Sequence, residues 1–251
     1  MYQQQRISQI LEELAQTGAM STQAIMARFD ISRETARRDI LFMTQRNLAE
    51  RTHGGIMSHE GPAAVIDYVD RRDQQAAGKQ AIGAAAAIMV QPKMTLYLDV
   101  STTVVALTQR LDVPVTVYTP SIDNANALLA NPKVELHMVG GRFDPNNRFF
   151  YDAANADLLK SVKFDIAFFG AASAEKDGFY VREADGAALK QLIIPRSRQR
   201  VMLMDHTKFG KQSSQLAALP TQLTGLVTDE PIPPAIAKAW PDQLTITVAE
   251  P

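Results

Sequence analysis

Short apolar runs alternate with helical stretches between residues 94 and 227, and this alternation restricts the possible folds more than any other feature of the chain. Buried parallel strands read as near-continuous apolar runs of this length. The runs are Met94–Leu98, Val115–Tyr118, Val134–Val139, Asp165–Phe169, Val201–Met204 and Gly225–Val227. The helical stretches between several of them are Val104–Leu111, Ile122–Ala130, Ala154–Lys160 and Glu183–Ile194. Strands that alternate with helices predict an α/β domain with a mostly parallel sheet.

Polar residues follow several of these runs, and in such sheets ligands bind beyond the carboxyl ends of the strands. The first run leads through Asp99 to Ser101, Thr102 and Thr103 at a helix start, where hydroxyls and free backbone N–H groups suit a phosphate. Helix capping is the more common use of such hydroxyls, so both interpretations stay open. Further candidates at the ends of later runs are Thr119, Gly140, Gly141, Asp205 and Lys208.

Lys208 has two interpretations. A lysine at a strand end, close to the hydroxyl loop, would neutralise a bound phosphate. A lone lysine in a loop is more often a solvated charge. Because several polar loops are expected to converge at this edge of the sheet, Lys208 is a candidate for the anion site.

The first sixty residues carry apolar residues at helical spacing. The stripe of an amphipathic helix that ends near residue 18 is formed by Ile7, Ile10, Leu11 and Leu14. Ser21 is a good N-cap for a second helix, and Ser32 for a third. On the third helix Ala36, Ile40 and Met43 share one face, which predicts a small helical core.

Polar side chains crowd the first turns of the third helix. They are Arg33, Thr35, Arg37 and Arg38. In a helix-turn-helix the N-terminal part of the second helix enters the major groove of DNA. A small helical bundle with a solvated charged face fits the spacing about equally well, because such spacing is common by chance.

A short hairpin is predicted directly after the third helix, from Leu48 to Ile56, with glycines that permit a tight turn at His53-Gly54-Gly55. A hairpin in this place is a wing, which favours the DNA-binding interpretation and brings Arg51 and His53 near the DNA backbone. His53 taken alone would more often be a solvated turn residue. The predicted DNA-binding residues are Ser32, Arg33, Thr35, Arg37, Arg38, Arg51 and His53.

The charge distribution shows how DNA binding would have to work. Residues 1–59 hold seven Arg and six Asp or Glu, a net charge of +1, whereas the remaining residues hold 19 basic and 21 acidic side chains, a net charge of -2. Neither part of the chain has the large positive net charge that is typical of nucleic-acid-binding proteins. DNA binding would therefore depend on the positions of individual arginines. The first lysine is Lys79, and arginine suits bidentate contacts to phosphate and guanine better than lysine does.

Length and composition bound the remaining possibilities. A chain of 251 residues predicts two domains, here 1–57 for the winged helix-turn-helix, 58–78 for a linker and 79–251 for the α/β domain. The absence of cysteine excludes disulfides, thiolate zinc sites and thiol catalysis, and no metal-ligand spacing or cofactor motif is evident. The N-terminus lacks a signal-peptide core, and the longest apolar run, Ala81 to Val90, is half a membrane span. We therefore expect a cytoplasmic protein without a membrane partner.

A family resemblance is carried by the segment Ser32–Ile40 (SRETARRDI) together with Leu48, Arg51 and His53-Gly54-Gly55. These residues resemble the signature of the DeoR family of bacterial transcription regulators, in their order and spacing. The family joins an N-terminal winged helix-turn-helix to a C-terminal sensor domain. The resemblance therefore implies a DNA-binding regulator.

The second half resembles the DeoR sensor domain, whose fold is related to ribose-5-phosphate isomerase and which typically senses phosphorylated sugars. The positions that carry this resemblance are Asp99, Thr102, Thr103, Gly140, Gly141, Gly170, Gly178, Glu183, Ala184, Lys190, Asp205, Lys208, Phe209, Gly210, Thr228 and Asp229. The resemblance adds Lys190 to the candidate effector-binding residues.

The chain departs from the family pattern at three places. Ser101 stands where the family usually has glycine, and its Cβ would hinder close approach of a phosphate to the backbone. Pro120 stands where the family usually has asparagine and lacks an amide donor. The segment Arg148–Tyr151 replaces a small glycine-containing turn, and its aromatic side chains could line, narrow or cover the pocket.

These observations lead to one main expectation and two alternatives. We expect a repressor of carbohydrate-metabolism genes that binds double-stranded operator DNA as a homo-oligomer, a dimer or tetramer, and is controlled by a sugar phosphate. The first alternative is a sugar-phosphate isomerase with a helical appendage, with Glu183 or Asp205 as base and Lys190 or Lys208 as its electrophilic partner. The second is a regulator whose α/β domain only oligomerises.

Overall fold

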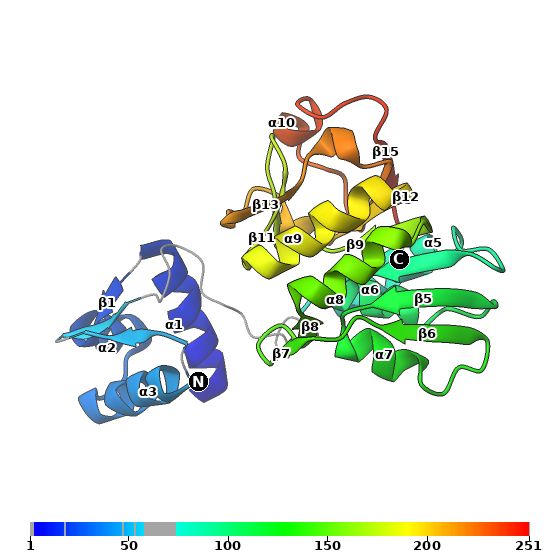
Figure 1. Ribbon diagram of the computed structural model, residues 1–251. Helices are drawn as coiled ribbons and strands as arrows, with labels where there is room; N and C mark the ends of the chain where they lie inside the picture. The colour runs from blue at the N-terminus through cyan, green and yellow to red at the C-terminus, as the bar shows by residue number, and fades with distance from the viewer. Residues whose placement is uncertain (1–2, 18, 47, 53, 58–73, 251) are drawn as a thin grey trace. The chain divides into compact units, whose positions relative to one another are not determined.

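The computed structural model describes residues 3–17, 19–46, 48–52, 54–57 and 74–250. Within the chain two compact units form, residues 1–66 and 67–251 (Figure 1). Most of the predicted linker, residues 58–78, lies outside the described residues. The helix that follows it begins at Ala76 rather than at Lys79.

The described part of the N-terminal unit is a three-helix core with a small antiparallel sheet of order β1-β3-β2. Its elements are α1 (Gln3–Thr17), β1 (Ala19–Ser21), α2 (Thr22–Phe29), α3 (Arg33–Gln45), β2 (Glu50–Arg51) and β3 (Gly55–Met57). The predicted helices and hairpin are confirmed. Both predicted caps form, since Ser21 Oγ accepts from Ala24 N at 3.0 Å and Ser32 Oγ accepts from Thr35 N at 3.2 Å.

Strand β1 was not predicted, and it ties the wing to the start of α2. Gly55 lies opposite Ser21 in the β1–β3 pair, so close that a Cβ at this position would collide with the Met20 carbonyl oxygen. Both the backbone N and the Oγ1 of Thr22 donate to Gly54 O, at 2.8 and 3.0 Å. The hairpin is therefore fastened to β1 and to the first residue of α2.

An ion pair is buried inside this unit, where helix α1 contacts helix α3. The Nε and Nη2 atoms of Arg6 donate to the two carboxylate oxygens of Asp39 at 2.6 and 3.2 Å, and Gln3 Nε2 donates at 3.0 Å. The hydrogen bond to Asp39 raises the pKa of Arg6 against the opposing effect of burial. Asp39 follows Arg37 and Arg38 directly and is fully buried, whereas both arginines are exposed. The pair fixes the rotation of α3, because a bidentate guanidinium–carboxylate contact has a definite geometry.

The described part of the second unit contains a seven-stranded sheet of order β15-β14-β12-β9-β4-β5-β6, and every neighbouring pair is parallel. Its strands are β4 (Thr95–Leu98), β5 (Val115–Thr119), β6 (Val134–Met138), β9 (Phe164–Phe169), β12 (Ser197–Leu203), β14 (Gly225–Thr228) and β15 (Thr245–Val248). Each predicted strand is confirmed. The edge strand β15 was not predicted.

Helices cover both faces of this sheet (Figure 1). They are α5 (Ala76–Ala87), α6 (Thr102–Thr108), α7 (Ile122–Leu128), α8 (Ala153–Leu158), α9 (Ala184–Ile193) and α10 (Pro234–Ala237), with short 3₁₀ turns η1 (Leu159–Ser161), η2 (Ile194–Arg196), η3 (His206–Lys208) and η4 (Pro220–Gln222). Two smaller sheets complete the unit: the hairpin β7 (Arg142–Asp144) with β8 (Phe149–Tyr151), and β10 (Ser173–Ala174) with β11 (Phe179–Val181) and β13 (Gln215–Ala218).

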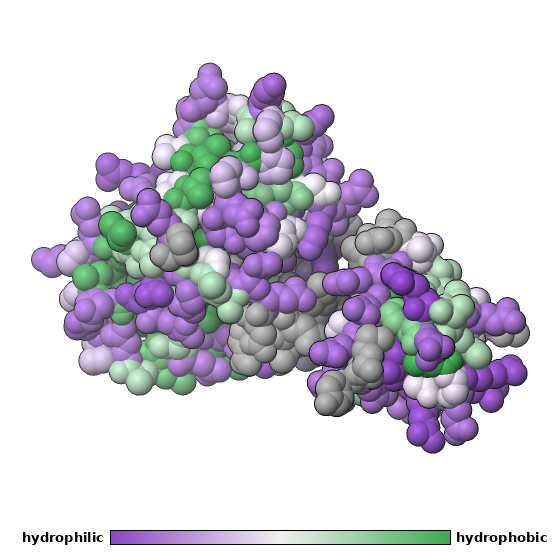
Figure 2. Space-filling view, turned by 180° about the vertical axis from the view of Figure 1, so that it is seen from behind, coloured by the Kyte–Doolittle hydropathy of each residue, from purple (hydrophilic) through white to green (hydrophobic). Residues whose placement is uncertain are grey.

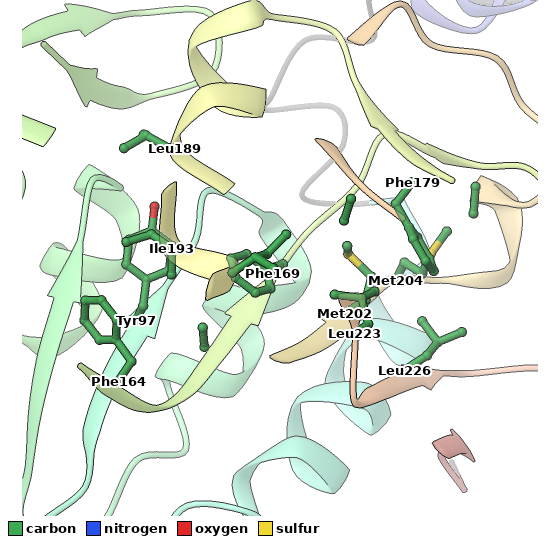
Figure 3. Packing of buried hydrophobic residues seen from close by; sticks show 14 of the residues in the cluster. Tyr97, Phe164, Phe169, Phe179, Leu189, Ile193, Met202, Met204, Leu223 and Leu226 are labelled. Atoms are coloured by element: carbon green, nitrogen blue, oxygen red, sulfur yellow. The ribbon is translucent and has the colours of Figure 1, made fainter. Parts of the chain in front are cut away.

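Alternate residues of each central strand enter two different cores. Leu96 and Leu98 of β4 pack with α5 and α6, whereas Tyr97 between them packs with α8 and α9 on the other face. Figure 3 shows the second core, in which Tyr97 lies beside Phe164 and Phe169. Because both faces are buried, these strands read as unbroken apolar runs.

The surface is mainly hydrophilic on the face shown in Figure 2, where hydrophobic residues gather in separate patches. Among the described helices, none combines the length and apolar character that crossing a membrane requires.

The Asp39 carboxylate yields a prediction about stability. Asp39→Ala would remove the carboxylate that pairs with the buried Arg6 guanidinium and lower the free energy of unfolding of the N-terminal unit by about 3–5 kcal/mol. Hydrogen–deuterium exchange of peptides from α1 and α3 measures the loss. Glu34→Ala, which removes an exposed carboxylate from the same helix, is the matched control and should change exchange little. Equal exchange in the two variants would refute a structural role for the pair.

Candidate functional site

Helix α3 turns its predicted DNA-binding arginines outward. Arg33, Arg37 and Arg38 are exposed, and Arg38 Nη2 lies 3.4 Å from Glu34 Oε1 in a contact that water screens. Thr35 is half-buried, and its Oγ1 lies 2.9 Å from the capping Ser32 Oγ. The helix thus presents an arginine-rich face with a defined first turn.

One predicted DNA-binding residue of the wing lies within the described part of the chain. Arg51 lies on β2 and is exposed. His53, the other predicted wing residue, lies outside the described residues.

A pocket opens in the second unit where the strand order reverses. From β4 the chain proceeds through β5 to β6 on one side, and β9, β12, β14 and β15 follow on the other, so β4 and β9 are neighbours whose connections diverge. This is the topological switch point at which open α/β sheets bind ligands. The pocket is lined by Asp99, Val100, Ser101, Thr102, Thr103, Asn147, Phe149, Gly170, Ala171, Ala172, Val181, Arg182, Glu183, Gly186, Leu189, Lys190, Met204 and Lys208.

The loop after β4 contributes hydroxyls and backbone amides to the pocket. Ser101 Oγ accepts from Thr103 N at 3.1 Å, so this side chain does cap helix α6, as the simpler interpretation of the hydroxyls held. Ser101 also packs against Gly170, where any Cβ would collide with it. The departure at residue 101 is therefore accommodated by the glycine at the end of β9, since the serine side chain occupies space that Gly170 leaves.

A buried ion pair forms one side of the pocket. Lys190 Nζ on α9 lies 2.8 Å from Asp99 Oδ2, and the two side chains are 3% and 2% exposed. The same oxygen accepts from Gly170 N at 3.0 Å. Asp99 thereby neutralises Lys190, and Lys208 and Arg182 are the other basic side chains in the lining.

Sequence reasoning missed Asn147 and Arg182 as lining residues, and it considered Glu183 only through the resemblance and as a possible enzyme base. Asn147 lies in the β7–β8 hairpin, and its Nδ2 donates to Glu183 Oε1 at 2.8 Å. The sequence did carry one signal for the lining role of Asn147. The adjacent segment 148–151 departs from the family pattern, which marks this hairpin as particular to the chain. Of its aromatic residues Phe149 lines the pocket, and Phe150 instead lies against Phe143, with the ring centroids 5.0 Å apart and the rings tilted.

Four predicted residues do not line this pocket. Thr119 is fully buried and its Oγ1 donates to Leu98 O at 2.6 Å, so the hydroxyl joins neighbouring strands. Gly140 and Gly141 lie between β6 and β7. Asp205 is buried and caps η3 by accepting from Thr207 N at 3.2 Å. The structure therefore brings together Asp99, Ser101, Thr102, Thr103, Lys190 and Lys208 from the predicted set.

No group of three or more histidine, aspartate or glutamate side chains suited to a metal ion occurs in the described parts of the chain. His206 instead lies beside two carboxylates, with its Nδ1 at 3.0 Å from Asp229 Oδ2 and 3.3 Å from Glu230 Oε1. Burial lowers the pKa of His206, but the hydrogen bond to Asp229 and the negative charges of Asp229, Glu230 and Asp205 together outweigh it. The pKa of His206 is therefore raised above its ordinary value.

Comparisons with known proteins agree across both units. Residues 6–61 match the family model described as the DeoR-like helix-turn-helix domain, and residues 74–230 match the DeoR C terminal sensor domain. The HTH-type transcriptional repressor GlcR of Bacillus subtilis (strain 168) is 30% identical over 230 residues, which cover 91% of this chain and 89% of that protein. The glycerol-3-phosphate regulon repressor of Escherichia coli (strain K12) is 26% identical over 247 residues, with 96% and 97% covered.

Among solved structures, ribose 5-phosphate isomerase A from Methanocaldococcus jannaschii matches 53% of this chain and 54% of its own chain, with 16% identity and a TM-score of 0.39. A likeness this slight does not bear on the function of the pocket.

The raised pKa of His206 gives a pH prediction. A folded-state pKa above the unfolded value of about 6.5 means that this contribution to stability is fully present below that pH and is lost as the pH rises through the folded pKa. We expect the stability of the α/β unit to fall with rising pH in this window, and less so in His206→Gln. Urea unfolding followed by fluorescence of Trp240, which packs in this unit, measures it. His137→Gln, on the edge strand β6, controls for loss of an imidazole, and identical pH slopes for wild type and His206→Gln would disprove the linkage.

Proposed function

The chain belongs to the DeoR family of transcription regulators, and from that premise we propose that it represses genes of carbohydrate metabolism under the control of a phosphorylated sugar bound in the switch-point pocket. The observation that carries the proposal is the pocket itself. In the unit that matches a sensor domain, the pocket joins the Asp99–Thr103 loop to Lys208 at the strand ends. Hydroxyls, amides and a cation suit a phosphate.

The names of the relatives support the finer parts of this proposal. GlcR is named a repressor, and the Escherichia coli relative is named for a glycerol-3-phosphate regulon. The isomerase alternative is not favoured, because both family models and these relatives belong to transcription regulators.

On DNA, the exposed arginines of α3 and the wing would contact phosphates, and the first turn of α3 would read base edges. One winged helix reads few base pairs, so we propose a symmetric dimer or tetramer on repeated half-sites, acting in the cytoplasm. A ligand can release DNA only if it binds the DNA-competent and incompetent arrangements with different affinity.

Footprinting on the DNA upstream of the chain's own gene tests the proposal as a whole. We expect a protected site whose occupancy falls when a sugar phosphate is added. If no footprint appears either with or without such metabolites, the proposal is wrong.

Arg37 gives a sharper prediction about DNA binding. Arg37→Ala should weaken operator binding by about 1–3 kcal/mol, because the exposed guanidinium would contact the major groove or its phosphates. Mobility shifts at fixed salt measure the loss, and thermal stabilisation by a sugar phosphate should stay unchanged. Arg46→Ala removes an arginine from the opposite end of the same helix and is the matched control. Equal losses in the two variants would argue against a special role for the first turns.

A further inference from the structure

We propose that Asn147 and Glu183 form a polar pair that reads hydroxyl groups of the effector, and that this pair restricts the pocket to polyhydroxylated compounds with a single phosphate. The inference rests on the proposed function, since it concerns the same pocket. It assigns a role to two lining residues that come from outside the phosphate-suited loop after β4.

The pair is built from two elements far apart in sequence. Asn147 Nδ2 donates to Glu183 Oε1 at 2.8 Å and to Asp144 Oδ2 at 3.1 Å. Glu183 occupies the N-cap position of α9, yet its side chain does not cap that helix. The carboxylate is thus held toward the hairpin. Because a carboxylate accepts several hydrogen bonds, the contact with Asn147 leaves capacity for ligand hydroxyls.

The hairpin that carries Asn147 is held in place independently of any ligand. Asp144 Oδ1 accepts from the backbone N of Asn146 at 2.8 Å and of Asn147 at 3.3 Å, which closes the turn. The guanidinium of Arg148, at a φ of 59°, donates to both carboxylate oxygens of Asp123 at 2.8 and 3.0 Å. Such a two-point contact anchors the hairpin to α7, so Asn147 is positioned before ligand arrives.

Charge in the lining indicates how many phosphates the pocket accepts. Asp99 and Lys190 neutralise each other at 2.8 Å. Arg182 and Lys208 add two positive charges, and Glu183 adds one negative charge, so the lining carries a net charge of +1. One phosphate monoester, with a charge of about -1.5 to -2 at pH 7, already offsets this balance. A second anionic group near Glu183 would meet a like charge, and selectivity often depends on such repulsion.

The loop after β4 and the turn η3 give the phosphate its place. Ser101, Thr102 and Thr103 supply hydroxyls and amides, and Lys208 supplies a cation. Removing the Asn147 amide should therefore affect recognition of the sugar and not of the phosphate.

Calorimetric titration of the full chain tests this division. The probes are glycerol 3-phosphate, ribose 5-phosphate, glucose 6-phosphate, fructose 1,6-bisphosphate and inorganic phosphate. For the monophosphate that wild type binds best, Asn147→Ala should weaken binding about tenfold or more, as expected for lost hydrogen bonds in a charged network. Binding of inorganic phosphate should not change. Asn146→Ala, an exposed neighbour in the same turn, is the matched control, and unchanged melting without ligand shows that each variant folds.

Glu183→Gln tests the charge. It should bind fructose 1,6-bisphosphate more tightly than wild type does, while Asn147→Ala should not. If wild type binds monophosphates and both variants behave as wild type, the inference is wrong and the proposed function stands. Preference of wild type for the bisphosphate would also overturn the inference alone. If wild type binds none of the probes, both the inference and the proposed sugar-phosphate control fail.

Discussion

The carboxylate of Asp99 accepts a hydrogen bond from the backbone N–H of Gly170 and pairs with the ammonium of Lys190. This one buried carboxylate therefore joins the ends of β4 and β9 to helix α9. Both side chains of the Asp99–Lys190 pair are buried, and desolvation offsets much of the attraction between them. The contact therefore contributes less to net stability than to geometry. Gly170 completes it, because the missing Cβ admits Ser101. The pocket depends on this arrangement, since the loops on either side of the switch point meet there.

Local chemistry explains why much of the fold could be predicted. Ser21 and Ser32 cap helices through bonds within a few residues, and central strands buried on both faces read as continuous apolar runs. Strand β15 alternates threonine with exposed apolar residues at the sheet edge and has no such signal. The β10–β11–β13 sheet consists of short segments whose pairing depends on distant partners. These elements are set by tertiary contacts that no local pattern encodes.

The same distinction applies to the pocket. The loop that carries Asp99, Thr102 and Thr103 follows β4 directly. The end of this strand was therefore enough to predict that these residues line the pocket. Thr119 is the last residue of its strand, but its hydroxyl donates inward to the Leu98 carbonyl oxygen. Asn147 reaches the pocket only because a hairpin folds back toward α9, a contact between residues 36 positions apart. The ends of the strands thus predict where the pocket lies. Segments that fold back from elsewhere in the chain, such as the β7–β8 hairpin, decide which side chains complete the lining.

The fastening of the wing to β1 has a mechanical consequence. Gly55 pairs with Ser21, and the carbonyl oxygen of Gly54 accepts hydrogen bonds from the backbone N and the Oγ1 of Thr22. The hairpin therefore cannot move without disturbing the start of α2. The Arg6–Asp39 contact holds α3 to α1 in the same way. Helix α3 and the wing thus behave as one rigid unit. In the proposed dimer or tetramer, control can then act on the distance and angle between two copies of this unit, and each copy keeps its own shape while the assembly gains or loses its fit to DNA.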